Sequence, residues 1–223
     1  MTERILDDET RQKVMEILED MDAPVEMVLV DEPLEMGEAV GGMLRLRQDL
    51  DQLLKEMTEI TDKISVRRLT PEEARAEGLE ADYTPALYLR RQGEDRKNVV
   101  FVGAPSGFEF GTLVEDIVDI SKGQTHLSPQ TKEFLSQLKE ELLVQVFVTP
   151  TCPYCPRMVR LAHQMAMESD LVKAQMVDAT QFPELASLYH VHAVPRTVVN
   201  RTLAIEGAVP EPVFINRVKS AVL

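Results

Sequence analysis

Residues 149–157 read Thr-Pro-Thr-Cys-Pro-Tyr-Cys-Pro-Arg and contain the only two cysteines of the 223-residue chain. Residues 143–148, immediately before this stretch, are mainly apolar and partly β-branched, which is typical of a buried parallel strand. After it, apolar residues between positions 158 and 165 recur at helical spacing. The sequence therefore predicts that Cys152 lies where a strand ends and a helix begins.

This location favours thiol chemistry at Cys152. A thiolate is the nucleophile in disulfide exchange, and the unpaired amides and dipole of a helix N-terminus stabilise an anion. We therefore expect the Cys152 thiol to have a lowered pKa, with Arg157 adding a nearby positive charge. Cys155, one turn further along, is expected to be more buried, to have a higher pKa and to resolve a mixed disulfide formed at Cys152. The redox-active Cys152–Cys155 disulfide then serves as the only redox centre, with no bound cofactor.

Two other interpretations of the cysteine pair are less favoured. A zinc site needs four ligands, whereas this motif and four scattered histidines supply only two at a suitable spacing. A structural disulfide closing so short a loop would restrict the unfolded chain very little. Redox chemistry is therefore the favoured interpretation.

Composition and charge restrict the compartment and the partners. No run approaches 18 apolar residues, and the start of the chain lacks the apolar segment of a secretory signal, so we expect a cytoplasmic protein. Residues 1–122 carry 29 acidic and 15 basic side chains, whereas residues 123–223 carry nine of each. Because such an acidic surface repels phosphate backbones and anionic lipid, neither nucleic acid nor a membrane is expected as a partner.

The predicted elements occur in the same order in both halves of the chain, with a linker around Gly123. Thr84-Pro85-Ala86 in the first half corresponds to Val194-Pro195-Arg196 in the second. Periodicity predicts helices at 14–21, 46–57, from 71, at 113–118, 129–142, 158–165, 183–189 and 214–222, and strands at 25–30, 64–69, 86–89, 99–102, 143–148, 172–177, 197–199 and 203–205.

This order of elements around Cys-x-x-Cys resembles the thioredoxin fold. Two such units in tandem resemble the protein disulfide oxidoreductases, glutaredoxin-like proteins of thermophilic archaea and bacteria. The most specific parts of the resemblance are residues 103–110, 149–155, 193–195 and 206–212. The resemblance implies an α/β protein with two tandem thioredoxin-fold units, at 1–122 and 123–223, each a central mixed β-sheet flanked by helices.

The resemblance also implies a substrate-binding site. In this fold the proline before the hairpin is cis and lies against the dithiol, and the preceding residue offers its backbone to an extended substrate. These two roles correspond to Pro195 and Val194. Tyr154, inside the Cys-x-x-Cys motif, is expected to bind the substrate together with them. His192, which flanks Val191 together with His190, is a less favoured candidate for a catalytic base.

The sequence departs from the family pattern in three ways. Family members usually carry a second Cys-x-x-Cys in the first unit, but the matching loop at 31–42 has no sulfur nucleophile, and Met36 cannot replace one. Thioredoxins place a carboxylate six residues before the first cysteine, where this chain has Val146. The Gly-Gly and Asp-Asp pattern with which small glutaredoxins bind glutathione is not present after the predicted hairpin at 197–205. We therefore expect a redox-silent first unit, and glutathione is not supported as the reductant.

The favoured function is a thiol–disulfide oxidoreductase acting on protein disulfides of client proteins and reset by an NADPH-linked, thioredoxin-reductase-like flavoprotein. One alternative is a dithiol relay that passes electrons from a reductase to a peroxiredoxin. It follows from a resemblance to the alkyl hydroperoxide reductase flavoprotein, whose N-terminal region also pairs a silent unit with an active one. Another is a non-catalytic module, in which the acidic half holds clients or two chains share an iron–sulfur cluster through their Cys152 residues.

Overall fold

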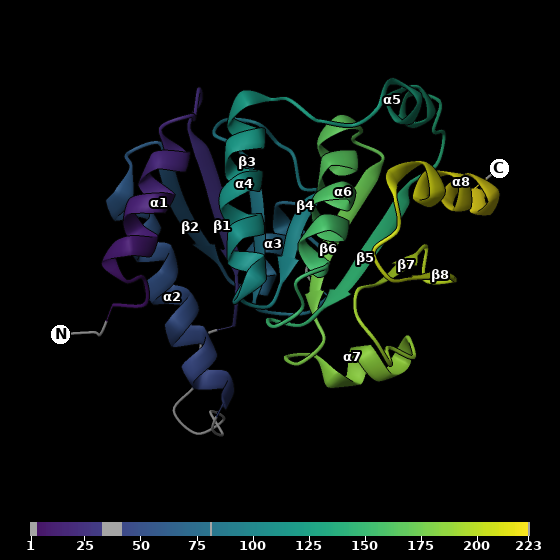
Figure 1. Cartoon of the computed structure of the whole chain (residues 1–223). Coiled ribbons are helices and arrows are strands. Elements are labelled where there is room, and N and C mark those ends of the chain that lie inside the picture. Colours follow the sequence, from purple (N-terminus) through teal and green to yellow (C-terminus); the bar gives the residue numbers. More distant parts are fainter. Residues whose placement is uncertain (1–3, 33–41, 81, 223) are drawn as a thin grey trace.

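The computed structural model describes residues 4–32, 42–80 and 82–222. Most of the predicted loop at 31–42, including Met36, lies outside these ranges. The chain is a mixture of helices and strands (Figure 1). In order they are α1 (Asp8–Leu18), β1 (Val25–Val30), α2 (Gly42–Ile60), β2 (Ile64–Leu69), α3 (Pro71–Ala76), β3 (Ala86–Arg91), β4 (Val99–Val102), α4 (Phe108–Lys122), α5 (Pro129–Ser136), β5 (Leu142–Val148), α6 (Cys155–Glu168), β6 (Val172–Asp178), α7 (Pro183–Leu188), β7 (Arg196–Val199), β8 (Leu203–Glu206) and α8 (Glu211–Val222).

The two halves contain the same series of elements, helix–strand–helix–strand–helix–strand–strand–helix. Pro85 and Pro195 each precede the third strand of their half, and both peptide bonds are cis, as predicted for Pro195. Gly123 ends α4 in the left-handed conformation, which a residue without Cβ adopts at little cost. The predicted repeat of the element order is thus confirmed. The boundary between the two units at 122/123 remains a prediction.

The strands form one continuous mixed sheet with the order β2-β1-β3-β4-β6-β5-β7-β8. The parallel pair β4 and β6 joins the halves, with Val99 opposite Ala174 and Val102 opposite Val177. The sequence predicted a sheet in each half but not this junction. Because β4 and β6 would otherwise be edge strands with unpaired amides and carbonyls, their pairing removes two exposed edges.

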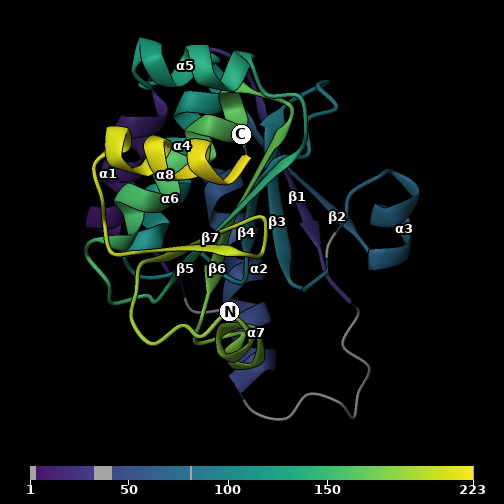
Figure 2. The same ribbon diagram turned by 90° about the vertical axis from the view of Figure 1, so that its right-hand side faces the viewer.

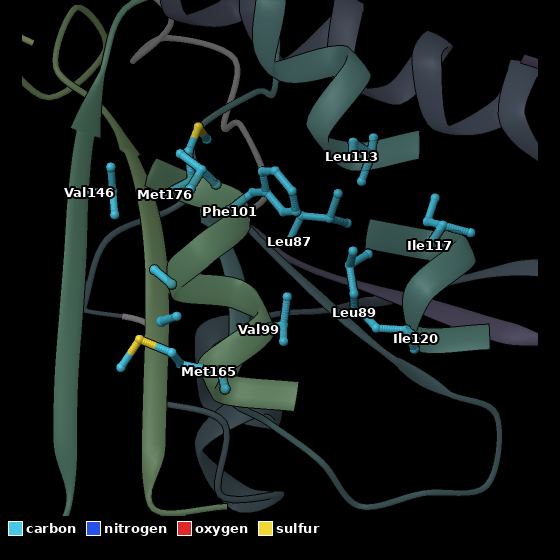
Figure 3. Packing of buried hydrophobic residues seen from close by; sticks show 14 of the residues in the cluster. Leu87, Leu89, Val99, Phe101, Leu113, Ile117, Ile120, Val146, Met165 and Met176 are labelled. Atoms are coloured by element: carbon cyan, nitrogen blue, oxygen red, sulfur yellow. The ribbon is translucent and has the colours of Figure 1, made fainter. Parts of the chain in front are cut away.

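The sheet separates two hydrophobic clusters. In Figure 2, α1, α4, α6 and α8 lie on one side of the sheet and α3 on the other. The larger cluster contains residues from strands and helices of both halves, and Figure 3 shows Leu87, Leu89 and Phe101 of the first half near Leu113 and Ile117 of α4. Because this one cluster includes buried residues of both halves, separating the halves would expose apolar surface and reduce the stability of the fold.

Two predicted boundaries outside the redox stretch need correction. Leu142, predicted at the end of a helix, is instead the first residue of β5 and pairs with Val172 of β6, because α5 already ends at Ser136. The helix predicted at 113–118 begins earlier, at Phe108, and extends to Lys122 as α4. Within the described ranges, no helix is both long and apolar enough to cross a membrane.

A third correction concerns the redox stretch, because α6 begins at Cys155 and not at Cys152. Proline has no amide hydrogen, so it fits a helix only within the first turn, where amides have no intrahelical partner. A helix beginning near Pro153 would place Pro156 where a donor is needed. Starting at Cys155 makes Pro156 the second helical residue and leaves Cys152 in the preceding turn.

Candidate redox site

Cys152 and Cys155 form a disulfide at the end of the sheet where the parallel strands terminate. β5 ends at Val148, and the Cys152 amide donates a hydrogen bond to the Thr149 carbonyl at 3.1 Å. Cys155 is completely buried, whereas Cys152 retains 8% of its accessible surface. Cys155 is therefore the more buried of the two, as predicted, and Cys152 is itself largely covered.

The other predicted site residues surround this loop. Tyr154 caps α6 and is 69% exposed, so its ring is available at the surface beside the disulfide. Phe147 pairs with Arg196, which brings Pro195 level with the end of β5. Val194 is partly buried and packs against the hydrophobic cluster that includes both cysteines. These residues are therefore gathered at one end of the sheet.

Two positions bear on proton transfer from Cys155, those of Val146 and His192. Val146 is completely buried in the larger hydrophobic cluster (Figure 3), so the position of the thioredoxin carboxylate is apolar here. His192 is exposed, and its ring lies against that of His190 with 6.5 Å between the centroids.

The first half of the chain touches the redox loop directly. The Phe108 amide donates to the Pro150 carbonyl at 3.0 Å, two residues before Cys152. Gly107 has φ +61°, and a Cβ at this position would lie only 2.0 Å from the Pro150 oxygen. The turn at 103–107 is also held by Gln181, whose Oε1 accepts from the Ala104 amide at 2.9 Å. Only glycine allows this close approach at position 107.

Glu109, the residue after Phe108, carries a buried carboxyl that was not predicted from the sequence. It is 1% exposed, Thr112 Oγ1 donates to its Oε2 at 2.7 Å, and its Oε1 has no hydrogen-bond partner among the described residues. Burial raises the pKa of Glu109 to about 7, although Thr112 and His163 act in the opposite direction. The available signal was its position four residues before Leu113, on the apolar face of α4.

A second buried carboxylate, Asp116, links α4 to α6. It accepts a hydrogen bond from Arg160 Nη1 at 3.0 Å and lies 2.6 Å from His163 Nδ1. The other ring nitrogen of His163 lies 3.2 Å from the Val100 carbonyl. Breaking one partner of such a buried pair is strongly destabilising, so this network holds the two halves together. In the ranges that the structure describes, no three His, Cys, Asp or Glu side chains are grouped so that they could hold a metal ion.

Comparison with known sequences agrees with this geometry. Residues 142–219 match the thioredoxin domain family. The NADH dehydrogenase of Bacillus subtilis is 25% identical over 153 residues, which cover 69% of this chain and 28% of the relative. The alkyl hydroperoxide reductase AhpF of Staphylococcus aureus is 24% identical over 196 residues, covering 88% of this chain and 34% of the relative. The chain therefore spans about a third of the length of these curated relatives.

Solved structures match along almost the entire chain. A domain of alkylhydroperoxide reductase AhpF from Enterococcus faecalis has a TM-score of 0.78 at 21% identity, covering 98% of this chain and 100% of that one. The protein disulfide oxidoreductase of Aeropyrum pernix has a TM-score of 0.85 at 26% identity, covering 98% and 95%. The chain thus has the thioredoxin fold, with a thioredoxin domain at residues 142–219 and a close structural match to the Aeropyrum pernix protein disulfide oxidoreductase.

Proposed function

We propose that this chain is a thiol–disulfide oxidoreductase that acts on protein disulfides through Cys152 and Cys155. The observation that carries the proposal is the disulfide itself, placed in a thioredoxin fold with its first cysteine less buried and next to the exposed Tyr154. Access matters because exchange requires the attacking thiolate to reach the sulfur of the client.

In the reducing direction, the Cys152 thiolate attacks one sulfur of a client disulfide and releases the other as a thiolate. The Cys155 thiolate then attacks the Cys152 sulfur, which releases the second client thiol and forms the Cys152–Cys155 disulfide. Two electrons pass from the dithiol to the client, and the reverse sequence oxidises a client dithiol. Val194, through its backbone, Pro195 and Tyr154 contact the client chain in this proposal.

Resolution also requires that the Cys155 thiol lose a proton. Because Val146 occupies the position of the thioredoxin carboxylate, this proton passes to water or to a base outside the contacts described above.

The oxidised pair must be reset by a donor of two electrons. An NADPH-linked, thioredoxin-reductase-like flavoprotein fits this role, since one curated relative is named for taking electrons from NADH and the other for reducing a hydroperoxide. The second candidate function is a relay from such a reductase to a peroxiredoxin. It is favoured by the 196 residues that align with the Staphylococcus aureus alkyl hydroperoxide reductase AhpF, which extend over 88% of the chain.

Turnover with a thioredoxin-type reductase tests the proposal and separates the two candidates. A protein disulfide oxidoreductase should reduce insulin at a rate that depends on both cysteines. A relay should instead reduce an oxidised peroxiredoxin with a much higher kcat/KM than insulin. If the reduced chain transfers electrons to neither substrate, the proposed function is wrong.

A further inference from the structure

A groove in the first half of the chain opens beside the redox loop. Its volume is about 580 Å³, within the range of ligand-binding pockets. The floor is apolar, formed by Leu6, Leu50 and Leu53, which are at most 7% exposed. Residues 104–107 and Phe110 form the wall nearest to α4. The groove therefore has the lining of a site for apolar side chains.

The groove and the redox loop share one wall. Gly107 lines the groove and also lies against Pro150, two residues before Cys152. Phe108, whose amide is bonded to the Pro150 carbonyl, is 51% exposed. An extended chain that reaches Cys152 can consequently continue past Phe108 into the groove.

The rim favours an apolar occupant over a charged one. Arg4 pairs with Asp8 at 3.4 Å, and Arg45 lies 4.0 Å from Asp49, so the charges at the rim are compensated. Ile5, also at the rim, is 42% exposed and would be covered by an apolar side chain entering the groove. Burial of such surface is the main favourable contribution that the groove can offer.

We propose that this groove is a second substrate subsite, which binds an apolar segment of the client protein next to the disulfide attacked by Cys152. The inference rests on the proposed function and extends it: the silent half selects clients whose disulfide is flanked by apolar residues. Each leucine-sized side chain buried in the groove is expected to raise kcat/KM about tenfold over a polar one.

Two disulfide peptides with the same cysteines measure this selection. One carries four leucine and alanine residues on each side of the disulfide, and the other carries serine and glycine there. The readout is the ratio of their kcat/KM values for each protein variant, because a general loss of activity or folded protein cancels in the ratio. The unmodified protein should prefer the apolar peptide about tenfold or more.

Matched substitutions locate the subsite. Ser106→Trp places a large ring at the mouth of the groove and should reduce the preference to about one, whereas Ser106→Ala should retain it. Ile5→Gln should lower the preference about threefold. Ile17→Gln is its control, because Ile17 is 43% exposed on α1 but does not line the groove.

The outcomes distinguish the possible failures. Turnover of both peptides at equal rates, or an apolar preference that survives Ser106→Trp, would overturn the subsite while leaving the proposed function intact. Failure to reduce even bis(2-hydroxyethyl) disulfide would overturn both. A dimer that dissociates on Ser106→Trp would show that a second copy of the chain occupies the groove, and would overturn the assignment to clients.

Discussion

The two halves of this chain have the same order of elements but different chemistry. The second half carries the Cys152–Cys155 disulfide, whereas the first half has no cysteine at all. Yet the first half contributes the close contact of Gly107 with Pro150 and the buried carboxyl of Glu109. The half without a cysteine therefore still contacts the loop that carries the disulfide of the other half.

Removing the first half should have the largest effect. Deletion of residues 1–122 exposes the edge of β6, opens the larger hydrophobic cluster and leaves Arg160 and His163 without Asp116. We expect the remaining half to lose cooperative unfolding and activity on small and protein disulfides alike. Circular dichroism during thermal unfolding measures this directly. A soluble fragment with a sharp transition and full activity on a small disulfide would mean that the halves are energetically independent.

Gly107→Ala should have the next largest effect, because it combines an unfavourable positive φ with a clash against Pro150. The backbone strain costs about 1–3 kcal/mol, and displacement of the redox loop should lower kcat/KM for a protein disulfide about tenfold or more. Gly93→Ala is the matched control, since Gly93 has φ +87° and no described atom within 4 Å of an added Cβ. Equal kinetics of the two variants would show that the contact with Pro150 does not position the loop.

Glu109→Gln should change the pH dependence of stability. Burial raises the pKa of Glu109 from its ordinary 4.5 to about 7, so the folded protein binds more protons than the unfolded chain between these values. The stability of the unmodified protein is therefore highest below the unfolded pKa and is lost as the pH rises through about 7. Relative to the unmodified protein, the free energy of unfolding of the Glu109→Gln variant should rise by up to about 3 kcal/mol between about pH 4.5 and pH 8.

Urea unfolding of the two proteins at a series of pH values measures this gain. Identical stability curves would contradict the raised pKa of Glu109.

Arg157→Ala should have the smallest effect. Arg157 is exposed in the first turn of α6, and an exposed pair of opposite charges contributes only about 0.2–1 kcal/mol. The pKa of the reduced Cys152 thiol should therefore rise by less than one unit, as measured by the rate of alkylation against pH. A much larger rise would show that Arg157, and not the helix terminus, lowers the pKa of this thiol.

The sequence predicted the parts of the molecule that depend on local patterns. Alternation and helical spacing indicated the order of elements, whereas the cis bond at Pro195 was implied by the resemblance to the thioredoxin fold. The β4–β6 junction was not predicted, because main-chain pairing between edge strands leaves little trace in side-chain periodicity. The contact of Gly107 with Pro150 joins residues 43 positions apart, and Glu109 looked like one more acid in an acidic half.

The central claim is that Cys152 attacks and Cys155 resolves, and trapping of mixed disulfides tests it most directly. Incubated with an extract of oxidised client proteins, the Cys155→Ser variant should accumulate stable mixed disulfides on Cys152, because the resolving thiol is absent. The Cys152→Ser variant should trap almost nothing, since Cys155 is completely buried. Non-reducing electrophoresis of the two variants shows the outcome. Comparable trapping by both variants, or by neither, would contradict the assignment.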